Sequence, residues 1–198
     1  TLGADNGIGV ASIMTLLAST DIPHPALEAL FTIDEETGMT GALGLQGGLL
    51  EADILLNLDT EDDDELTIGC AGGIDVTIGG NYKTEKVNPI SIGFRITVKG
   101  LTGGHSGMDI YKGRGNANKL IARILLSAAD KFEPRIKTTD GGGLRNAIPR
   151  EAFAEVAIHT GESEDFTALI SQEAELIKKE YQSTDPNLSI SIETIVTP

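Results

Sequence analysis

The spacing of hydrophobic residues changes near residue 90, and this change divides the chain into two dissimilar halves. Before that point, apolar residues form continuous runs between helical stretches, whereas after it they alternate with polar residues. Continuous runs are typical of strands buried on both faces of a parallel sheet, and alternation is typical of strands with one face in solvent. We therefore predict one domain over residues 1–89 and a second over 90–198, with the crossing in 72–89.

The first half is predicted to be a partial three-layer αβα domain with a mostly parallel sheet. Helical spacing of apolar residues predicts a helix over 8–19 and a short one over 41–46. Apolar runs of strand length lie at 26–33 and 52–58. Helices alternating with such strands indicate an α/β fold. No strand precedes the first helix, so we expect the sheet to be incomplete.

The second half is predicted to be a ferredoxin-like α+β domain. Its alternating segments and amphipathic stretches follow the order β-α-β-β-α-β, which defines that fold. The expected elements are strands at 92–98, 135–139, 152–158 and 188–192, and helices at 116–131 and from an N-cap at Ser163.

Composition excludes several classes of partner. The net charge of −15 repels phosphate backbones and anionic membrane surfaces, so we expect no nucleic acid and no membrane partner. No apolar run approaches the roughly 18 residues that a membrane span requires. The lone cysteine, Cys70, excludes an internal disulfide, which agrees with a reducing cytoplasm. Its apolar neighbours predict a small core residue.

Acidic residues follow the predicted strands of the first half. Asp5 precedes the first helix, Glu35 and Glu36 follow the run at 26–33, and Asp59 follows the next run. Because ligands of open parallel sheets bind outside the carboxyl ends of the strands, these carboxylates are expected to share one crevice. Crowded carboxylates repel one another unless a cation joins them, and divalent metals suit oxygen ligands.

Each of these residues also has an ordinary structural interpretation. Asp5 alone reads as a helix N-cap, Glu35 and Glu36 as a solvated pair, and Asp59 as the start of an exposed acidic loop. Three other ligand motifs are weak. A dinucleotide fingerprint lacks its third glycine at Ser12, no P-loop Gly-Lys-Ser/Thr occurs, and Asp64 occupies the glycine position of an EF-hand.

Several motifs in one order resemble a known enzyme family. The stretches TLGADNGIGVA, DEETGMTGALGL and NLDTEDDDELTIGCAGG are similar to the catalytic core of the zinc aminoacylase and carboxypeptidase clan. The stretches GLTGGHSGMDI, GRGNANKL and GGLRNAIPREAF narrow the resemblance to aminoacyl-histidine (Xaa-His, carnosinase-like) dipeptidases. Together they cover most of the chain.

The resemblance implies hydrolysis of Xaa-His dipeptides at a centre of two zinc ions, with manganese or cobalt as alternatives. Asp5 would bridge the metals and be followed by a cis peptide bond, while Glu36 and Asp59 would each hold one metal. Glu35 would be the general base and acid, taking a proton from water and returning it to the leaving amine.

The resemblance also implies roles for the second half as a lid and dimerisation domain. His105 would hydrogen-bond the oxyanion, in dimeric relatives within the partner's site, and Asn146 would contact the substrate's carboxylate end. A cytoplasmic homodimer is expected. His24 and His159 have no matching role, and His159 is expected to be structural.

The motifs depart from the family at both ends. Its His-x-Asp motif should precede Asp5, and a second ligand histidine and a substrate-gripping basic residue should lie beyond Pro198. We therefore expect an internal fragment with an incomplete ligand set, inactive and weak in zinc binding by itself. A tripeptidase or N-acyl amino acid amidohydrolase of the same clan remains an alternative, as does a non-catalytic dimerisation module.

Overall fold

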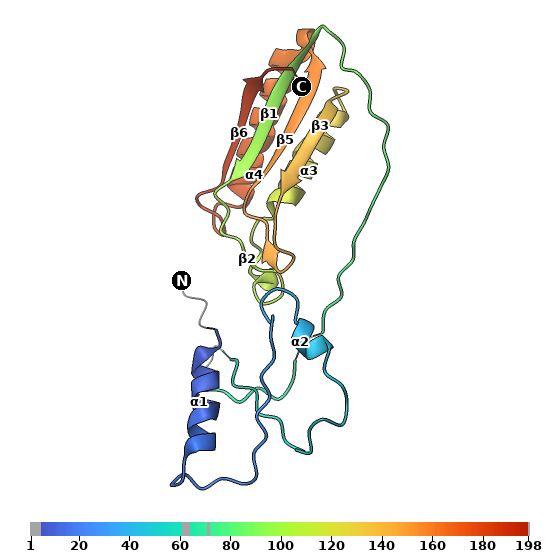
Figure 1. Ribbon diagram of the computed structural model, residues 1–198. Helices are drawn as coiled ribbons and strands as arrows, with labels where there is room; N and C mark the ends of the chain where they lie inside the picture. Colours follow the sequence, from blue (N-terminus) through green and yellow to red (C-terminus); the bar gives the residue numbers. More distant parts are fainter. Residues whose placement is uncertain (1–4, 61–63, 71, 198) are drawn as a thin grey trace. The chain divides into compact units, whose positions relative to one another are not determined.

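The computed structural model of the chain describes residues 5–60, 64–70 and 72–197. They form two compact units, an N-terminal unit assigned to Thr1–Ile78 and a C-terminal unit, Gly79–Pro198. Each unit has its own elements (Figure 1).

A four-stranded antiparallel sheet organises the C-terminal unit, with strand order β3-β5-β1-β6. The central strands are β1 (Ser91–Lys99) and β5 (Ala152–His159), and the edges are β3 (Arg135–Gly141) and β6 (Ser189–Ile195). This order is that of a ferredoxin-like fold, so the predicted class of the second half is confirmed.

Two helices cover one face of this sheet (Figure 1). Helix α3 (Ala117–Ala129) begins after Asn116, whose side chain accepts the Lys119 amide at 3.2 Å, a normal N-cap. Helix α4 spans Ser163–Glu180. The alternating positions of β1 and β5 and the apolar stripes of both helices meet in the core, where ring centroids of Phe94 and Phe166 lie 5.4 Å apart.

The start of α4 corrects one prediction. Ser163 is the first residue of the helix rather than its N-cap. A short 3-10 helix, η2 (Thr160–Glu162), already coils the chain before it, so Glu162 occupies the cap position and makes no side-chain cap bond. His159 ends β5, and its Nδ1 accepts the Gly161 amide at 3.1 Å, which is the structural role expected of it.

The polar positions of the same strands form an ion-paired face on the other side of the sheet. Arg95 lies 3.8 Å from the centroid of the Phe153 ring and 3.2 Å from Glu155. Lys137 reaches the other oxygen of Glu155 at 3.1 Å. The alternation in sequence thus separates a buried apolar face from a charged one.

The N-terminal unit contains two helices among its described residues. Helix α1 spans Gly7–Ala18, and α2 is one turn, Thr40–Leu43. Both agree with the predicted helices to within a few residues. Gly41 lies against the backbone of Ile33, where an added Cβ would come within 2.6 Å of the Ile33 nitrogen, and its amide donates to the Ile33 carbonyl at 3.2 Å.

The two strands predicted in this unit are not formed. Residues 26–33 and 52–58 carry no ladder in the structure, and Leu55 is 79% exposed. An apolar run becomes a strand only when neighbouring strands satisfy its backbone, and no such neighbour exists among the described residues of this unit. The expectation of a buried Cys70 is wrong for the same reason, because it lies in an exposed stretch without a helix or strand.

The mixed α/β class is therefore confirmed, with the antiparallel sheet in the C-terminal unit. Along the chain, the boundary between the units falls between Ile78 and Gly79. The proposed domain boundary at residues 89 and 90 stays a prediction. No helix in the described part of the chain is long and apolar enough to cross a membrane.

Candidate functional site

Glu35 and Glu36 lie on a tight turn that begins at Asp34. Asp34 has a left-handed backbone (φ 63°), and its carbonyl accepts the amides of Gly38 at 3.2 Å and Met39 at 2.5 Å. Its carboxylate accepts the hydroxyls of Thr37 and, at 2.8 Å, of Thr40. These hydrogen bonds, that from Thr37 first, lower the pKa of Asp34. The turn leaves both glutamates exposed.

Asp5 and Asp59 are linked through their chain neighbours. The side chain of Asn6 donates to the Leu58 carbonyl at 3.0 Å, across 52 positions of sequence, and its oxygen accepts the Gly9 amide at 2.9 Å as the N-cap of α1. The helix cap considered for Asp5 is therefore made by Asn6. The Asp5–Asn6 peptide bond is cis, as the resemblance implies.

The proposed metal ligands suit a divalent cation by type but do not form a closed group. Carboxylate oxygens are hard donors that divalent metals accept. Among the described residues, no three His, Cys, Asp or Glu side chains are placed together to hold a metal ion. Asp5, Glu36 and Asp59 are all exposed. Their joint role as ligands therefore stays a prediction.

The C-terminal unit brings His105 and Asn146 onto neighbouring segments. Strand β2 (Gly104–His105) pairs antiparallel with β4 (Ala147–Ile148), and His105 lies opposite Ala147. The Ser106 amide donates to the Asn146 carbonyl at 2.8 Å. Both predicted substrate-binding residues are exposed. The sequence placed them 41 positions apart, and the structure joins them through one short ladder.

Two backbone amides determine the tautomer of His105. The amides of Gly107 and Met108 both point to its Nδ1, each at 3.1 Å. A nitrogen that accepts hydrogen bonds carries no proton, so in the neutral ring the proton lies on Nε2. His105 therefore offers Nε2–H as a hydrogen-bond donor.

Asp109 holds the backbone of the His105 loop. Its Oδ2 accepts the His105 amide at 2.8 Å, while Lys112 at 2.6 Å and Arg114 at 3.6 Å pair with the carboxylate. The Lys112 hydrogen bond and the His105 amide lower the pKa of Asp109. Gly104, at φ 144°, leaves the space for this contact, since a Cβ there would lie 2.4 Å from Asp109 Oδ2.

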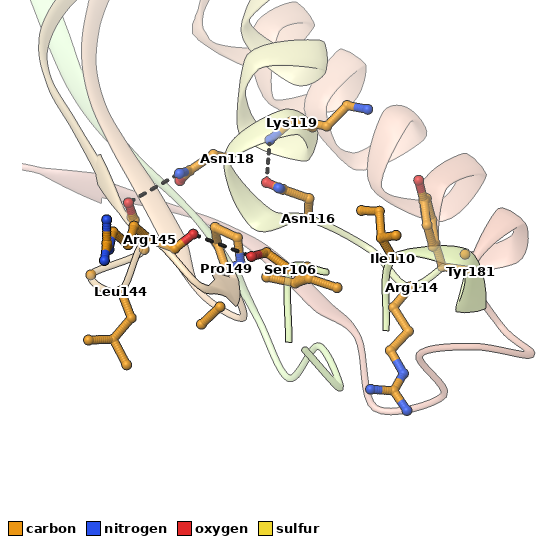
Figure 2. A pocket seen from close by; sticks show the side chains of 16 residues that line it. Ser106, Ile110, Arg114, Asn116, Asn118, Lys119, Leu144, Arg145, Pro149 and Tyr181 are labelled. Carbon is orange, nitrogen blue, oxygen red and sulfur yellow. Dashed lines mark hydrogen bonds between the residues drawn. The ribbon is translucent and has the colours of Figure 1, made fainter. Parts of the chain in front are cut away.

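A pocket of about 760 Å³ lies beside this ladder, between the N-terminus of α3 and the loop around Arg145 (Figure 2). Its basic side chains, Arg114, Lys119 and Arg145, extend in different directions (Figure 2). The Asn118 amide is engaged with the Gly141 carbonyl at 3.2 Å. The pocket therefore has no convergent cationic group for an anion.

Asp185 joins two loops of the C-terminal unit. It is 1% exposed, and its Oδ1 accepts the Thr102 amide at 2.7 Å. Its Oδ2 accepts the Gly115 amide at 2.8 Å and the Thr184 hydroxyl at 3.0 Å. Burial raises the pKa of Asp185, but the hydrogen bonds outweigh it and the net pKa is lowered.

Sequence reasoning missed Asp34, Asp109 and Asp185. The first had a local signal, because Asp and Thr side chains often form local hydrogen bonds in turns and Thr37 is three positions from Asp34. Asp109 precedes two basic residues within five positions, which by itself is an ordinary surface pattern. Asp185 had no local signal, since its partner Thr102 is 83 positions away.

The family model described as "Peptidase dimerisation domain" matches residues 90–185. Residues 90–185 are therefore similar to a peptidase dimerisation domain. The matched residues include the His105 loop, the Asn146 turn and Asp185.

Two relatives match almost the whole chain. The cytosol non-specific dipeptidase of Escherichia coli (strain K12) is 46% identical over 195 residues, which cover 98% of this chain and 40% of that protein. The crystal structure of aminoacylhistidine dipeptidase from Vibrio alginolyticus matches with a TM-score of 0.75 at 46% identity, covering all of this chain and 40% of that one. The chain thus spans two fifths of the length of these relatives, and the predicted resemblance is confirmed.

Proposed function

We propose that this chain is part of a metal-dependent dipeptidase that hydrolyses Xaa-His dipeptides. The observation that carries the proposal is the 46% identity to an aminoacylhistidine dipeptidase over the full chain, together with a TM-score of 0.75. Zinc is the proposed metal, two ions to a site, with manganese or cobalt as alternatives.

The N-terminal unit would supply the acidic half of the centre. Asp5, Glu36 and Asp59 would hold the metals, with Asp5 shared between them. Bound divalent cations supply Lewis acidity to the peptide carbonyl and to water. Glu35, on the turn next to Glu36, would take a proton from water and deliver it to the leaving amine. Its exposed carboxylate is free of the hydrogen bonds that engage Asp34.

The dimerisation domain would supply the substrate contacts. His105 presents Nε2–H, because Gly107 and Met108 occupy Nδ1. A hydrogen-bond donor held in place by the backbone suits the negative charge that develops on a carbonyl oxygen during hydrolysis. Asn146, on the turn joined to Ser106, would contact the carboxylate end of the dipeptide.

A homodimer through the dimerisation domain is the proposed assembly, located in the cytosol like the relative from Escherichia coli. In the four-stranded sheet, β3 and β6 each have a strand on one side only. Such edges are available for pairing with a second copy. The charge of −15 does not favour nucleic acid or anionic membranes as partners.

Hydrolysis of β-alanyl-histidine by the complete gene product tests the proposal. We expect turnover that chelation with EDTA abolishes and that zinc, manganese or cobalt restores. A tripeptide and an N-acyl amino acid in parallel assays would distinguish the alternative hydrolases. A chelator-resistant dimer in sedimentation velocity with no hydrolysis of any of these would instead support a non-catalytic dimerisation module.

A further inference from the structure

We propose that Asp34 and Thr40 act together as positioning residues for Glu35 and Glu36. The proposal rests on the proposed function, because it assigns to these two residues the orientation of the glutamates during hydrolysis. It is carried by the turn that joins residue 33 to α2, which contains both glutamates and is built around one carboxylate.

The backbone of this turn has few alternatives. Asp34 and Met39 are the positive-φ residues other than glycine in the described chain, at φ 63° and 55°. The Asp34 carbonyl receives two amides, those of Gly38 and Met39, which closes the turn around the glutamates. Left-handed residues other than glycine cost free energy and persist where the surroundings require them.

Side-chain hydrogen bonds hold the same turn in addition to the backbone bonds. One carboxylate oxygen of Asp34 accepts the Thr37 hydroxyl and the other accepts that of Thr40 at 2.8 Å. Thr40 is the first residue of α2, so this bond joins the turn to the helix. The next residue, Gly41, holds the helix against Ile33, because its amide donates a hydrogen bond to the Ile33 carbonyl at 3.2 Å.

The two glutamates lie in the chain between Asp34 and Thr40, and the hydrogen bonds that hold the turn do not involve their carboxylates. Their carboxylates are exposed, whereas the carboxylate of Asp34 receives two hydroxyls inside the turn. Adjacent glutamates must point in different directions if one is to serve a metal and the other a substrate. A rigid turn fixes the direction of each glutamate side chain, whereas a loosened turn lets each side chain take the direction of the other.

The test compares Asp34→Gly, Thr40→Val and Thr40→Ser in the complete gene product. Glycine accepts the left-handed backbone but removes the carboxylate, valine removes the hydroxyl at equal size, and serine restores it. We expect kcat for β-alanyl-histidine to fall about 10–100-fold in the first two, as for other residues that orient catalytic groups, with KM changed little. Thr40→Ser should stay near the wild-type kcat.

A second readout does not depend on activity. In metal-free protein, hydrogen exchange at the Gly38 and Met39 amides should accelerate in Asp34→Gly and Thr40→Val and remain slow in Thr40→Ser.

Matched controls are Asp21→Gly and Thr15→Val. Asp21 accepts the Ser19 hydroxyl at 2.8 Å, and the Thr15 hydroxyl donates to the Ala11 carbonyl at 2.7 Å, so each loses a similar bond elsewhere. Both variants should leave kcat and the rate of hydrogen exchange at the Gly38 and Met39 amides unchanged.

Unchanged kcat in Asp34→Gly with active wild-type protein would overturn the proposal, as would slow exchange at both amides. A wild-type protein that hydrolyses no dipeptide would instead contradict the proposed function.

Discussion

Replacing Glu35 by Gln is expected to lower kcat for dipeptide hydrolysis by about 10²–10⁴-fold. Glutamine keeps the size of the side chain and its place on the Asp34 turn, but it cannot take a proton from water at neutral pH. The metal content should stay at the wild-type level, because the ligand role is proposed for Glu36. Steady-state kinetics and elemental analysis on one sample measure both quantities.

Glu51→Gln is the matched control, since Glu51 is likewise exposed in the N-terminal unit and has no proposed role. It should match the wild type in kcat. If Glu35→Gln keeps its kcat, or loses metal as Glu36→Gln does, the assignment of the general base to Glu35 is wrong.

Replacing Asp185 by Ala is expected to destabilise the C-terminal unit by about 3 kcal/mol. The change leaves the part-buried amide of Thr102 and the buried amide of Gly115 without an acceptor, and each unsatisfied buried donor costs about 1–3 kcal/mol. Urea unfolding monitored by circular dichroism measures the loss. Asp130→Asn, at an exposed position after α3, should change the free energy of unfolding by less than about 0.5 kcal/mol.

The loss should depend on pH in one direction. Because the pKa of Asp185 is lowered in the folded state, its contribution is complete above the ordinary aspartate value of 3.8. It disappears as the pH falls from there through the lowered folded pKa. The stability gap between wild type and Asp185→Ala should therefore be constant near neutrality and narrow in acid. A gap that widens in acid would contradict this account.

The ferredoxin-like half could be predicted because the residues of its core recur at regular strand and helix spacings in the sequence. Phe94, Ile96 and Val98 alternate along β1, and all three are buried. The stripe of α4, which includes Phe166 and Ile177, packs on the same core. Strands β2 and β4 could not be predicted, because two residues carry no periodicity.

The first half shows that the spacing of apolar residues does not say whether a strand has neighbours to pair with. The helices of this half depend on local spacing and caps, such as Asn6, and were found. The strands at 26–33 and 52–58 depend on hydrogen bonds to other strands, and the described residues of the N-terminal unit provide none. The burial expected for Cys70 failed with them.

In the candidate site, too, some residues could be predicted from the sequence and others depend on contacts that only the structure shows. Strand-end position and motif order selected Glu35, His105 and Asn146. The groups that support them act through contacts that spacing does not show, such as the Nδ1 acceptor of His105. Asp185 is the extreme case, since it joins segments 70 and 83 positions away.

Metal content of the complete gene product and its variants tests most directly whether three separate carboxylates form one centre. We expect about two equivalents of divalent metal per chain in the wild type, as in other two-metal sites. Asp5→Asn, Glu36→Gln and Asp59→Asn should each lower that content, whereas Asp53→Asn should not. Full metal content in all three variants, or none in the wild type, would contradict the account.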